Sequence, residues 1–494
     1  MNNLGGWIIN NVKDARTGGG LAAGIPFAIW QRQWEVCDLS GNRARSRVIA
    51  GKISELARRH PRYAVPDRLY NAKIHFYSGE YARALELSQA ALLLSRQDED
   101  DSRLPEIYGQ LSQSHQSLSN YEKALEYRAL AAELYRSQED QISLGNSLAN
   151  SGLIYWKMGR FQEALSHLEQ ARKIFENNHD ERSMAVVLTN TANVLLATDE
   201  MEQAQKNYLA SLAICQRTGD LSKQSSLHNN LGAIAFRRAD YSGAMKHYTM
   251  GLRIDEILGN LTGQAAKLSN MAVMLGSMGK HDEAMSSFER ALKIDMKTGN
   301  QDGQMRKLGN IATLYSIKGN YPRAIEFIDQ AIAISLKINS RGYYGYFLSQ
   351  KISYLGNLGD NAGAKAIGNE AIELTKDSGN LSQLSTLYSN LADVYYDTDE
   401  LDKAYEYSSL ALNIIKNHEL FEVLKENSWY THSMILEKTG RIPESLEYLK
   451  MAYDEVQGKA RNIGDEQERK GFLTKNRAIA EIVEKWESSQ PKEK

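Results

Sequence analysis

Small residues recur every 40 positions along most of this 494-residue chain, and this period constrains its fold more than any other feature. One ladder consists of Ala84, Ala124, Ala164, Ala204, Ala244, Ala284, Ala324, Ala364 and Ala404. A second consists of Ala91, Ala131, Ala171, Ser211, Gly251, Ala291, Ala331, Ala371 and Ala411. A third consists of Ala72, Ser112, Gly152, Ala192, Gly232, Ala272, Ala312, Ile352 and Ala392. Self-similarity at a fixed period of this length indicates a repeat architecture.

Each repeat is predicted to form two helices, illustrated by the third copy. A first helix over 144–158 is followed by a turn at Gly159 and a second helix over 161–177. Apolar residues of the second helix recur at helical spacing, namely Ala164, Leu168, Ala171 and Ile174. Two antiparallel helices approach closely only where side chains are small, and a bulky residue there would cost about 1–3 kcal/mol.

Gly-Asp and Gly-Asn pairs separate several copies. These pairs end at Asp220, Asn260, Asn300 and Asn380. Glycine adopts the left-handed conformation that ends many helices, so we expect helix C-caps at these four positions.

Composition narrows the class of protein. Lys and Arg number 59 against 61 Asp and Glu, a net charge of −2 that predicts no general affinity for nucleic acid or membrane. The chain has only two cysteines, Cys37 and Cys215, too few for a disulfide scaffold or a four-cysteine zinc site. The apolar stretch over 18–30 is too short to span a bilayer, and no secretory signal precedes it. We therefore expect a cytoplasmic protein in a reducing compartment.

The repeat resembles the tetratricopeptide repeat (TPR) superfamily. The resemblance lies in the small residue Gly152, the aromatic Tyr155, the turn glycine Gly159, the aromatic Phe161, and the alanines of the first two ladders. The 40-residue period with Gly-Asp/Asn loops is similar to the subclass found in Pins/LGN-like adaptors and in bacterial regulatory TPR proteins. The resemblance implies an all-α, right-handed superhelical solenoid of about ten helical hairpins, with the first helices lining a concave groove.

Domain boundaries follow from the extent of the repeats. We expect the TPR array over 65–457, preceded by a degenerate first repeat or N-terminal cap over 26–64 and a loosely ordered segment over 1–25. After the array we expect one capping helix over 458–487, because a solenoid needs an end with a polar outer face, and a disordered tail over 488–494. The cap also resembles the segment that precedes a CHAT protease domain in some bacterial repeat proteins.

One copy departs from the pattern between Arg341 and Gly368. Ile352 replaces the small residue of the first helix, and "RGYYGYFL" (341–348) stands where the loop is expected. Two interpretations are open: a local break in the superhelix that serves as a hinge, or a copy that has drifted in sequence.

A ladder of amides is the candidate binding site. It consists of Asn150, Asn190, Asn230, Asn270, Asn310 and Asn390, with Gln110 and Gln350 in two further copies. Each lies two residues before the small residue of the first helix, about 200° from the packing face, and therefore points toward the groove. An amide both donates and accepts hydrogen bonds, so such a row can hold the backbone of an extended peptide. The resemblance implies the same role; alternatively, each amide bonds the adjacent copy and stiffens the stack.

Neighbouring positions add further groove candidates. The residues proposed to bind peptide with the asparagines are Trp156, Arg237, Arg306 and Tyr346. Aromatic residues and arginine often anchor interfaces, although each could equally be an ordinary solvated or packed side chain. Asp393 and Asp397 would make the far end of the groove acidic.

The sequence gives little support for catalysis or for cofactor binding. The ten histidines show no metal-ligand spacing, the glycines at 18–20 lack the Lys-Ser/Thr of a phosphate loop, and no GxSxG occurs. We expect no enzyme activity, no cofactor and no metal. The basic cluster over 43–62 is interpreted as a solvated face, the alternatives being an acidic partner or nucleic acid.

The leading hypothesis is a non-catalytic scaffold or adaptor that binds an extended or helical segment of another protein in its groove. The alternative is a regulatory or sensor subunit of a multi-protein system, possibly linked to a CHAT protease in bacteria, whose superhelix changes on ligand binding. Neither the partner nor the oligomeric state follows from the sequence.

Overall fold

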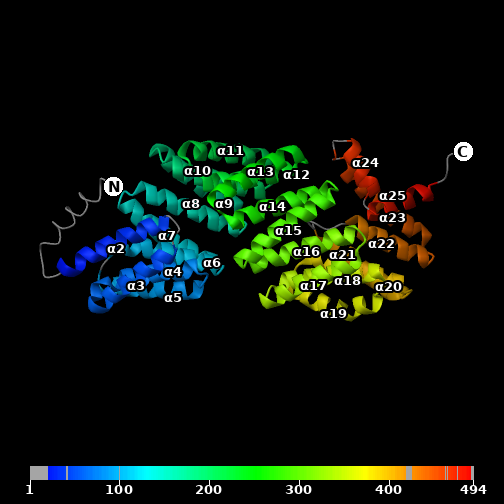
Figure 1. Cartoon of the computed structure of the whole chain (residues 1–494), viewed down its shortest axis with the longest axis horizontal. Coiled ribbons are helices and arrows are strands. Elements are labelled where there is room, and N and C mark those ends of the chain that lie inside the picture. The colour runs from blue at the N-terminus through cyan, green and yellow to red at the C-terminus, as the bar shows by residue number, and fades with distance from the viewer. Residues whose placement is uncertain are drawn as a thin grey trace. The chain divides into compact units, whose positions relative to one another are not determined.

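A computed structural model describes residues 21–39, 43–99, 101–418, 425–461, 463, 466–475 and 477–490 of the chain. These residues form helices α2 to α25 and two short 3₁₀ helices, and no strand occurs among them. The chain divides into two compact units, Met1–Gly219 (unit 1) and Asp220–Lys494 (unit 2). Within each unit, consecutive helices pack as antiparallel pairs (Figure 1). The expected all-α repeat fold is confirmed.

Unit 1 contains ten α-helices among its described residues. They are α2 (Leu21–Leu39), α3 (Arg43–Arg59), α4 (Ala64–Tyr77), α5 (Tyr81–Gln97), α6 (Leu104–Ser117), α7 (Tyr121–Ser137), α8 (Gln141–Lys157), α9 (Phe161–Asn177), α10 (Glu181–Ala197) and α11 (Met201–Thr218). The 3₁₀ helices Pro61–Tyr63 and Asp101–Arg103 precede α4 and α6. From α4 to α23, each even-numbered helix is the first helix of a repeat and each odd-numbered helix is the second.

Unit 2 continues the same alternation. Its helices are α12 (Leu221–Arg237), α13 (Tyr241–Leu258), α14 (Leu261–Ser277), α15 (His281–Thr298), α16 (Gln301–Ile317), α17 (Tyr321–Lys337), α18 (Arg341–Leu358), α19 (Asn361–Ser378), α20 (Leu381–Asp397), α21 (Leu401–Asn417), α22 (Lys425–Lys438), α23 (Ile442–Arg461), α24 (Glu466–Lys475) and α25 (Arg477–Ser489). None of the described helices is long and apolar enough to cross a bilayer.

Loop residues end and begin the helices as their chemistry requires. The glycines of the four Gly-Asp/Asn pairs all have positive φ and cap the preceding helix, as expected: Gly219, Gly259, Gly299 and Gly379. The next residue then caps the following helix, because its side-chain oxygen accepts a backbone N–H three positions later, as Asn300 does from Gly303 at 3.1 Å. Each loop is therefore short and turns the chain back on itself.

The small residues mark the closest contacts between helices. A Cβ added to Gly152 on α8 would stand 2.8 Å from Leu168 Cγ and 3.1 Å from the carbonyl oxygen of Ala164, both on α9. Ala164 and Ala171 are completely buried. The packing role inferred from the ladders therefore holds for this pair of helices.

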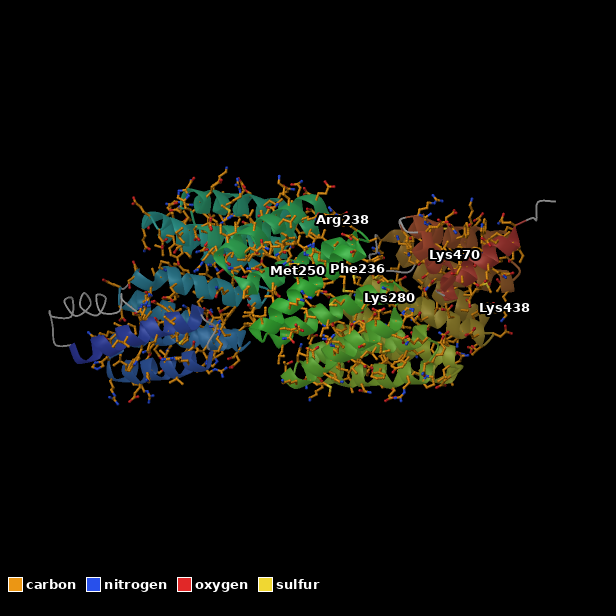
Figure 2. All side chains as sticks on the ribbon, turned by 45° about the horizontal axis from the view of Figure 1, so that its top comes forward. Phe236, Arg238, Met250, Lys280, Lys438 and Lys470 are labelled. Atoms are coloured by element: carbon orange, nitrogen blue, oxygen red, sulfur yellow. The ribbon has the colours of Figure 1, made fainter. Side chains whose placement is uncertain are left out.

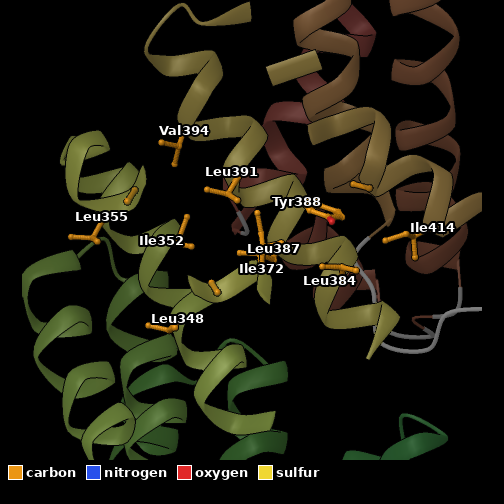
Figure 3. Packing of buried hydrophobic residues seen from close by; sticks show 13 residues of the cluster. Leu348, Ile352, Leu355, Ile372, Leu384, Leu387, Tyr388, Leu391, Val394 and Ile414 are labelled. Carbon is orange, nitrogen blue, oxygen red and sulfur yellow. The ribbon is translucent and has the colours of Figure 1, made fainter. Parts of the chain in front are cut away.

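The irregular copy is a regular hairpin, and the break expected at 341–368 is absent. Residues 341–348, expected to replace a loop, form the start of α18, and Ile352 lies in the core cluster of Figure 3. The small residue has moved to the other helix: Gly368 of α19 stands where the third repeat has Leu168, and a Cβ on it would lie 2.9 Å from Leu391 of α20. The glycine on the second helix of this repeat therefore allows Leu391 of the following helix to approach closely.

The two ends differ in detail from the expected domains. Instead of one capping helix over 458–487, α23 continues to Arg461, and α24 and α25 follow as separate helices. Ile479 and Ile482 of α25 are buried against Ala452 and Val456 of α23, so the array is covered as a cap requires.

At the other end, α2 and α3 pack against each other in the region expected to be a degenerate first repeat or an N-terminal cap over 26–64. Trp34 of α2 is buried with Ile49 and Ile53 of α3 and with Tyr70 of α4. The segment expected to be loosely ordered, 1–25, lies outside the described residues as far as residue 20, and α2 begins at Leu21. Of the tail 488–494, residues 491–494 lie outside the described residues.

Candidate functional site

All six asparagines of the ladder lie on first helices. Asn150 (α8) and Asn190 (α10) belong to unit 1, whereas Asn230 (α12), Asn270 (α14), Asn310 (α16) and Asn390 (α20) belong to unit 2. Their accessibility differs along the row. Asn190 is buried, with 9% of its surface exposed, Asn310 is exposed, and the other four are half-buried.

Amides of the ladder bridge neighbouring first helices in unit 2. Asn270 Nδ2 donates to Asn229 Oδ1 of α12 at 2.8 Å. Asn390 Nδ2 donates to the backbone oxygen of Ser349 on α18 at 3.0 Å. Gln350, which fills the ladder position in α18, donates through Nε2 to Thr313 Oγ1 of α16 at 3.2 Å. In each of these copies the amide ties its helix to the preceding first helix, as the stack-stiffening interpretation predicts.

Other ladder amides do not bridge helices in this way. Asn150 Nδ2 donates to the backbone oxygen of Asn146 in its own helix at 2.8 Å. Asn230 and Asn310 remain accessible on the surfaces of α12 and α16. An amide offers two donor hydrogens and an acceptor oxygen, so even the bridging residues keep unused capacity. The ladder can therefore combine both roles.

The remaining predicted groove residues occupy different environments. Trp156 is half-buried and packs against the apolar cluster of α8 and α9. Arg237 is exposed at the end of α12, and Arg306 is exposed and paired with Asp302 of its own helix at 2.6 Å. Tyr346 is 38% exposed, and its hydroxyl accepts from Gln350 Nε2 at 3.1 Å. Arg237, Arg306 and Tyr346 are thus available at the surface, whereas Trp156 is mainly a packing residue.

Phe236 of α12, next to Arg237, is also a packing residue. Together with Met245 it packs against the buried cluster that Ala244, Tyr248 and Met274 form in unit 2. Figure 2 marks the place of Phe236 on the chain. Phe236 and Trp156, both near the ends of first helices, are therefore shared with the core.

The acidic residues of α20 have unusual surroundings. Asp393 is accessible to solvent, yet enough protein surrounds it that desolvation raises its pKa to about 7, while Thr431 donates a hydrogen bond to its Oδ1 at 2.7 Å. Burial also raises the pKa of Asp397, which Lys438 partly offsets. Asp393 would therefore change charge near neutral pH.

The structure also reveals a paired motif that the sequence analysis did not identify. Lys267 Nζ lies 2.8 Å from Asp255 Oδ2, and Lys307 Nζ lies 2.7 Å from Asp295 Oδ2, with all four side chains at least nine-tenths buried. The sequence signal is the spacing D-x3-GN-x2-GQ-x2-K, which occurs at 255–267 and again at 295–307. Because this pattern occurs in two copies, it is less conspicuous than the ladders of small residues, which extend over nine copies.

Metal-binding side chains do not converge among the described residues, in which no group of three or more His, Cys, Asp or Glu could hold an ion. A close histidine pair, His228 and His247, joins α12 to α13 with 3.0 Å between the two Nδ1 atoms. Burial lowers the pKa of both rings, which favours their neutral forms. This pair is best described as a contact within the hairpin.

Comparisons with known proteins point to the same repeat. The sequence model described as "Tetratricopeptide repeat" matches residues 103–177, 183–257 and 263–337. A second family model, "Anaphase-promoting complex subunit 5", matches residues 313–397. No curated protein sequence gives a significant match.

Solved structures with similar folds include bacterial regulators. The apo quorum sensor NprR of B. thuringiensis is 16% identical, and the match covers 68% of this chain and 97% of that one with a TM-score of 0.49. Aspartyl phosphate phosphatase F of Bacillus subtilis is 14% identical, with 73% and 97% covered and a TM-score of 0.48. A Rap protein complexed with Competence and Sporulation Factor is 18% identical, with 71% and 97% covered and a TM-score of 0.46. Values this low identify no shared ligand or activity.

Proposed function

Because the chain belongs to the tetratricopeptide-repeat superfamily, we propose that it is a non-catalytic interaction scaffold that binds an extended segment of a partner protein along its first helices. Repeat solenoids present extended surfaces suited to such segments. Fold alone does not define a ligand, so the proposal rests on the residues that line these helices.

The observation that carries the proposal is the recurring amide on the first helices. Asparagine is a poor former of helix interiors, so its repetition there calls for a reason other than helix propensity. Bridging bonds account for Asn270 and Asn390 but not for the accessible Asn230 and Asn310. Peptide backbone presents N–H and C=O groups alternately, which matches what an amide row offers.

A pair of substitutions separates binding from stability. We expect Asn230→Ala with Asn310→Ala to reduce partner recovery strongly, because both amides are accessible, while the unfolding midpoint changes little. Asn270→Ala is expected to lower stability, because it leaves Asn229 without its donor. Affinity purification with quantitative mass spectrometry, beside thermal unfolding of each purified variant, measures both effects.

Asn207→Ala is the matched control, since Asn207 lies on the second helix α11 and bonds the backbone oxygen of Gln203 in that same helix. Partner recovery by the Asn230/Asn310 double variant equal to that of this control would contradict peptide binding by the ladder.

A regulatory or sensor role is the second candidate, because an interaction surface of this kind also suits a protein whose partner signals a state. The hinge expected at 341–368 does not support it, since α18 and α19 form a regular hairpin. Small-angle scattering of the full chain with and without a captured partner tests this role. An unchanged radius of gyration and distance distribution would count against the sensor role, and the scaffold role would remain as the single candidate.

The cellular setting is also a proposal. Both cysteines, Cys37 and Cys215, are buried free thiols, which suits the reducing compartment expected from the composition. We propose a cytoplasmic protein whose partner is another protein rather than nucleic acid or a membrane.

A further inference from the structure

Arg128 of α7 occupies a buried position that holds an uncharged residue in the other repeats, Ser88 in the preceding copy. The equivalent residues of the next five repeats are buried apolar or aromatic side chains, namely Leu168, Tyr208, Tyr248, Phe288 and Ile328. Arg128 itself is only 6% exposed. Charged side chains are rarely buried to this degree unless they are paired, so this arginine requires a partner.

No partner is present among the described residues. Arg128 Nε and Nη2 are fully shielded from solvent and form no hydrogen bond. The carboxylate of Glu106, on the adjacent α6, is engaged by Lys73 at 2.7 Å and by Arg103 at 3.3 Å. Burial raises the pKa of the nearby Tyr135, so its phenol is neutral and supplies no counter-charge.

The guanidinium nevertheless remains charged. Burial lowers the pKa of Arg128 to about 10, which leaves it protonated at neutral pH. A buried cation without an acceptor is one of the costliest arrangements in a protein interior. Such a feature, where the next five repeats use an apolar or aromatic residue, is expected at a ligand site rather than in a purely structural position.

An opening leads to this guanidinium from the adjacent helix. Gly109 of α6 is partly exposed, and a Cβ added there would meet only Arg128 Nη1, at 3.8 Å, among side chains and neighbouring helices. A ligand atom at the place of this Cβ, on a partly exposed residue, would therefore lie within contact distance of Nη1. Helices α6 and α7 are paired in unit 1 (Figure 1), so the site lies within a single hairpin.

We propose that Arg128 is the receptor of a small oxyanion, either a carboxylate or a phosphate, which enters beside Gly109 and pairs with the guanidinium inside the α6–α7 hairpin. An oxygen of such an anion can accept hydrogen bonds from Nη1, and charge-assisted bonds of this kind are strong. This site is separate from the amide ladder and does not depend on peptide binding.

The test measures thermal unfolding of the full chain in chloride, acetate and phosphate at equal ionic strength and pH. Each anion is added at about ten times its dissociation constant. We expect acetate or phosphate to raise the unfolding midpoint of the wild type by about 2–4 °C more than it raises the midpoint of Arg128→Leu. The leucine is the residue of the next repeat, so the variant should fold and should be at least as stable in chloride. Comparison of the two anions distinguishes a carboxylate from a phosphate ligand.

Two further variants exclude indirect effects. Arg136→Leu removes the same charge from an exposed position of α7 and is expected to respond to the anions as the wild type does. Gly109→Leu fills the opening while keeping Arg128, and it is expected to lose the response. Equal anion-dependent shifts in the wild type and Arg128→Leu, or no shift in the wild type, would overturn the proposal. A full response in Gly109→Leu would overturn the proposed entry beside Gly109.

Discussion

Removal of one partner from a buried ion pair is expected to produce the largest local loss of stability in unit 2. Lys307 of α16 and Asp295 of α15 have side chains only 9% and 0% exposed, with 2.7 Å between Nζ and Oδ2. Lys307→Met keeps the length of the aliphatic chain but leaves the Asp295 carboxylate buried with a single hydrogen bond, from Asn300 Nδ2 at 2.9 Å. Leaving one charge of a buried pair uncompensated costs about 3–5 kcal/mol.

The magnitude is checked against two related variants. Lys307→Met combined with Asp295→Leu removes both charges, and we expect it to recover most of the loss, with about 1 kcal/mol remaining for the missing bond to Asn300. Arg306→Ala is the neighbouring control, because its pair with Asp302 is about half exposed on both sides. An exposed pair of this kind contributes about 0–1 kcal/mol.

The assay must report on the hairpins concerned, because repeat arrays do not always unfold in a single step. Urea unfolding gives the global free energy, and hydrogen exchange with mass spectrometry gives the opening free energy of peptides from α15 and α16. We expect Lys307→Met to accelerate exchange in these helices far more than Arg306→Ala does. Equal effects of the two substitutions, or a double variant as unstable as the single one, would refute the reasoning.

Two further predictions concern the core of unit 2. Burial lowers the pKa of His432 to about 4, below its usual value near 6.5, so the neutral form of the ring is favoured in the folded chain. The contribution of this group to the free energy of unfolding is therefore complete above about pH 6.5 and falls by up to about 3 kcal/mol as the pH approaches 4. His432→Asn should flatten this slope in urea unfolding measured as a function of pH. Gly368→Ala should lower the free energy of unfolding by about 1–3 kcal/mol, because the new Cβ would stand 2.9 Å from Leu391. Gly342→Ala is the control and should not destabilise the chain, because its Cβ would have open space around it. Equal unfolding midpoints for the two alanine variants would show that α20 shifts to accept the new Cβ without loss of stability.

Much of the fold could be predicted from the sequence because repetition makes local information cumulative. One glycine such as Gly152 is a weak signal, but the same small position in successive copies identifies a helix contact. The caps followed for the same reason, since Gly299 and Asn300 each carry a conformational or hydrogen-bonding preference that acts within a few residues. These features depend on interactions between residues that are close to one another in the sequence.

The candidate site was predicted less completely. The ladder's position on the first helices was correct, but equal spacing in sequence concealed unequal environments. Asn270 donates to the amide oxygen of Asn229, whereas Asn310 meets solvent. The replacement of a small residue by Ile352 suggested a break in the superhelix, whereas in the structure Ile352 packs in a core cluster with residues of α19 and α20.

Sequence by itself determined the period, the pairing of helices and the capping of their ends, because each of these follows from interactions within one turn or one hairpin. Tertiary structure alone decided which amides are bonded, which charges are paired and which are buried alone. Lys307 pairs with Asp295, whereas Arg128 pairs with no carboxylate among the described residues. Lys307 and Arg128 are nevertheless both basic residues on regular helices. That difference arises from what the adjacent helices bring within a few ångströms, which no local pattern of residues records.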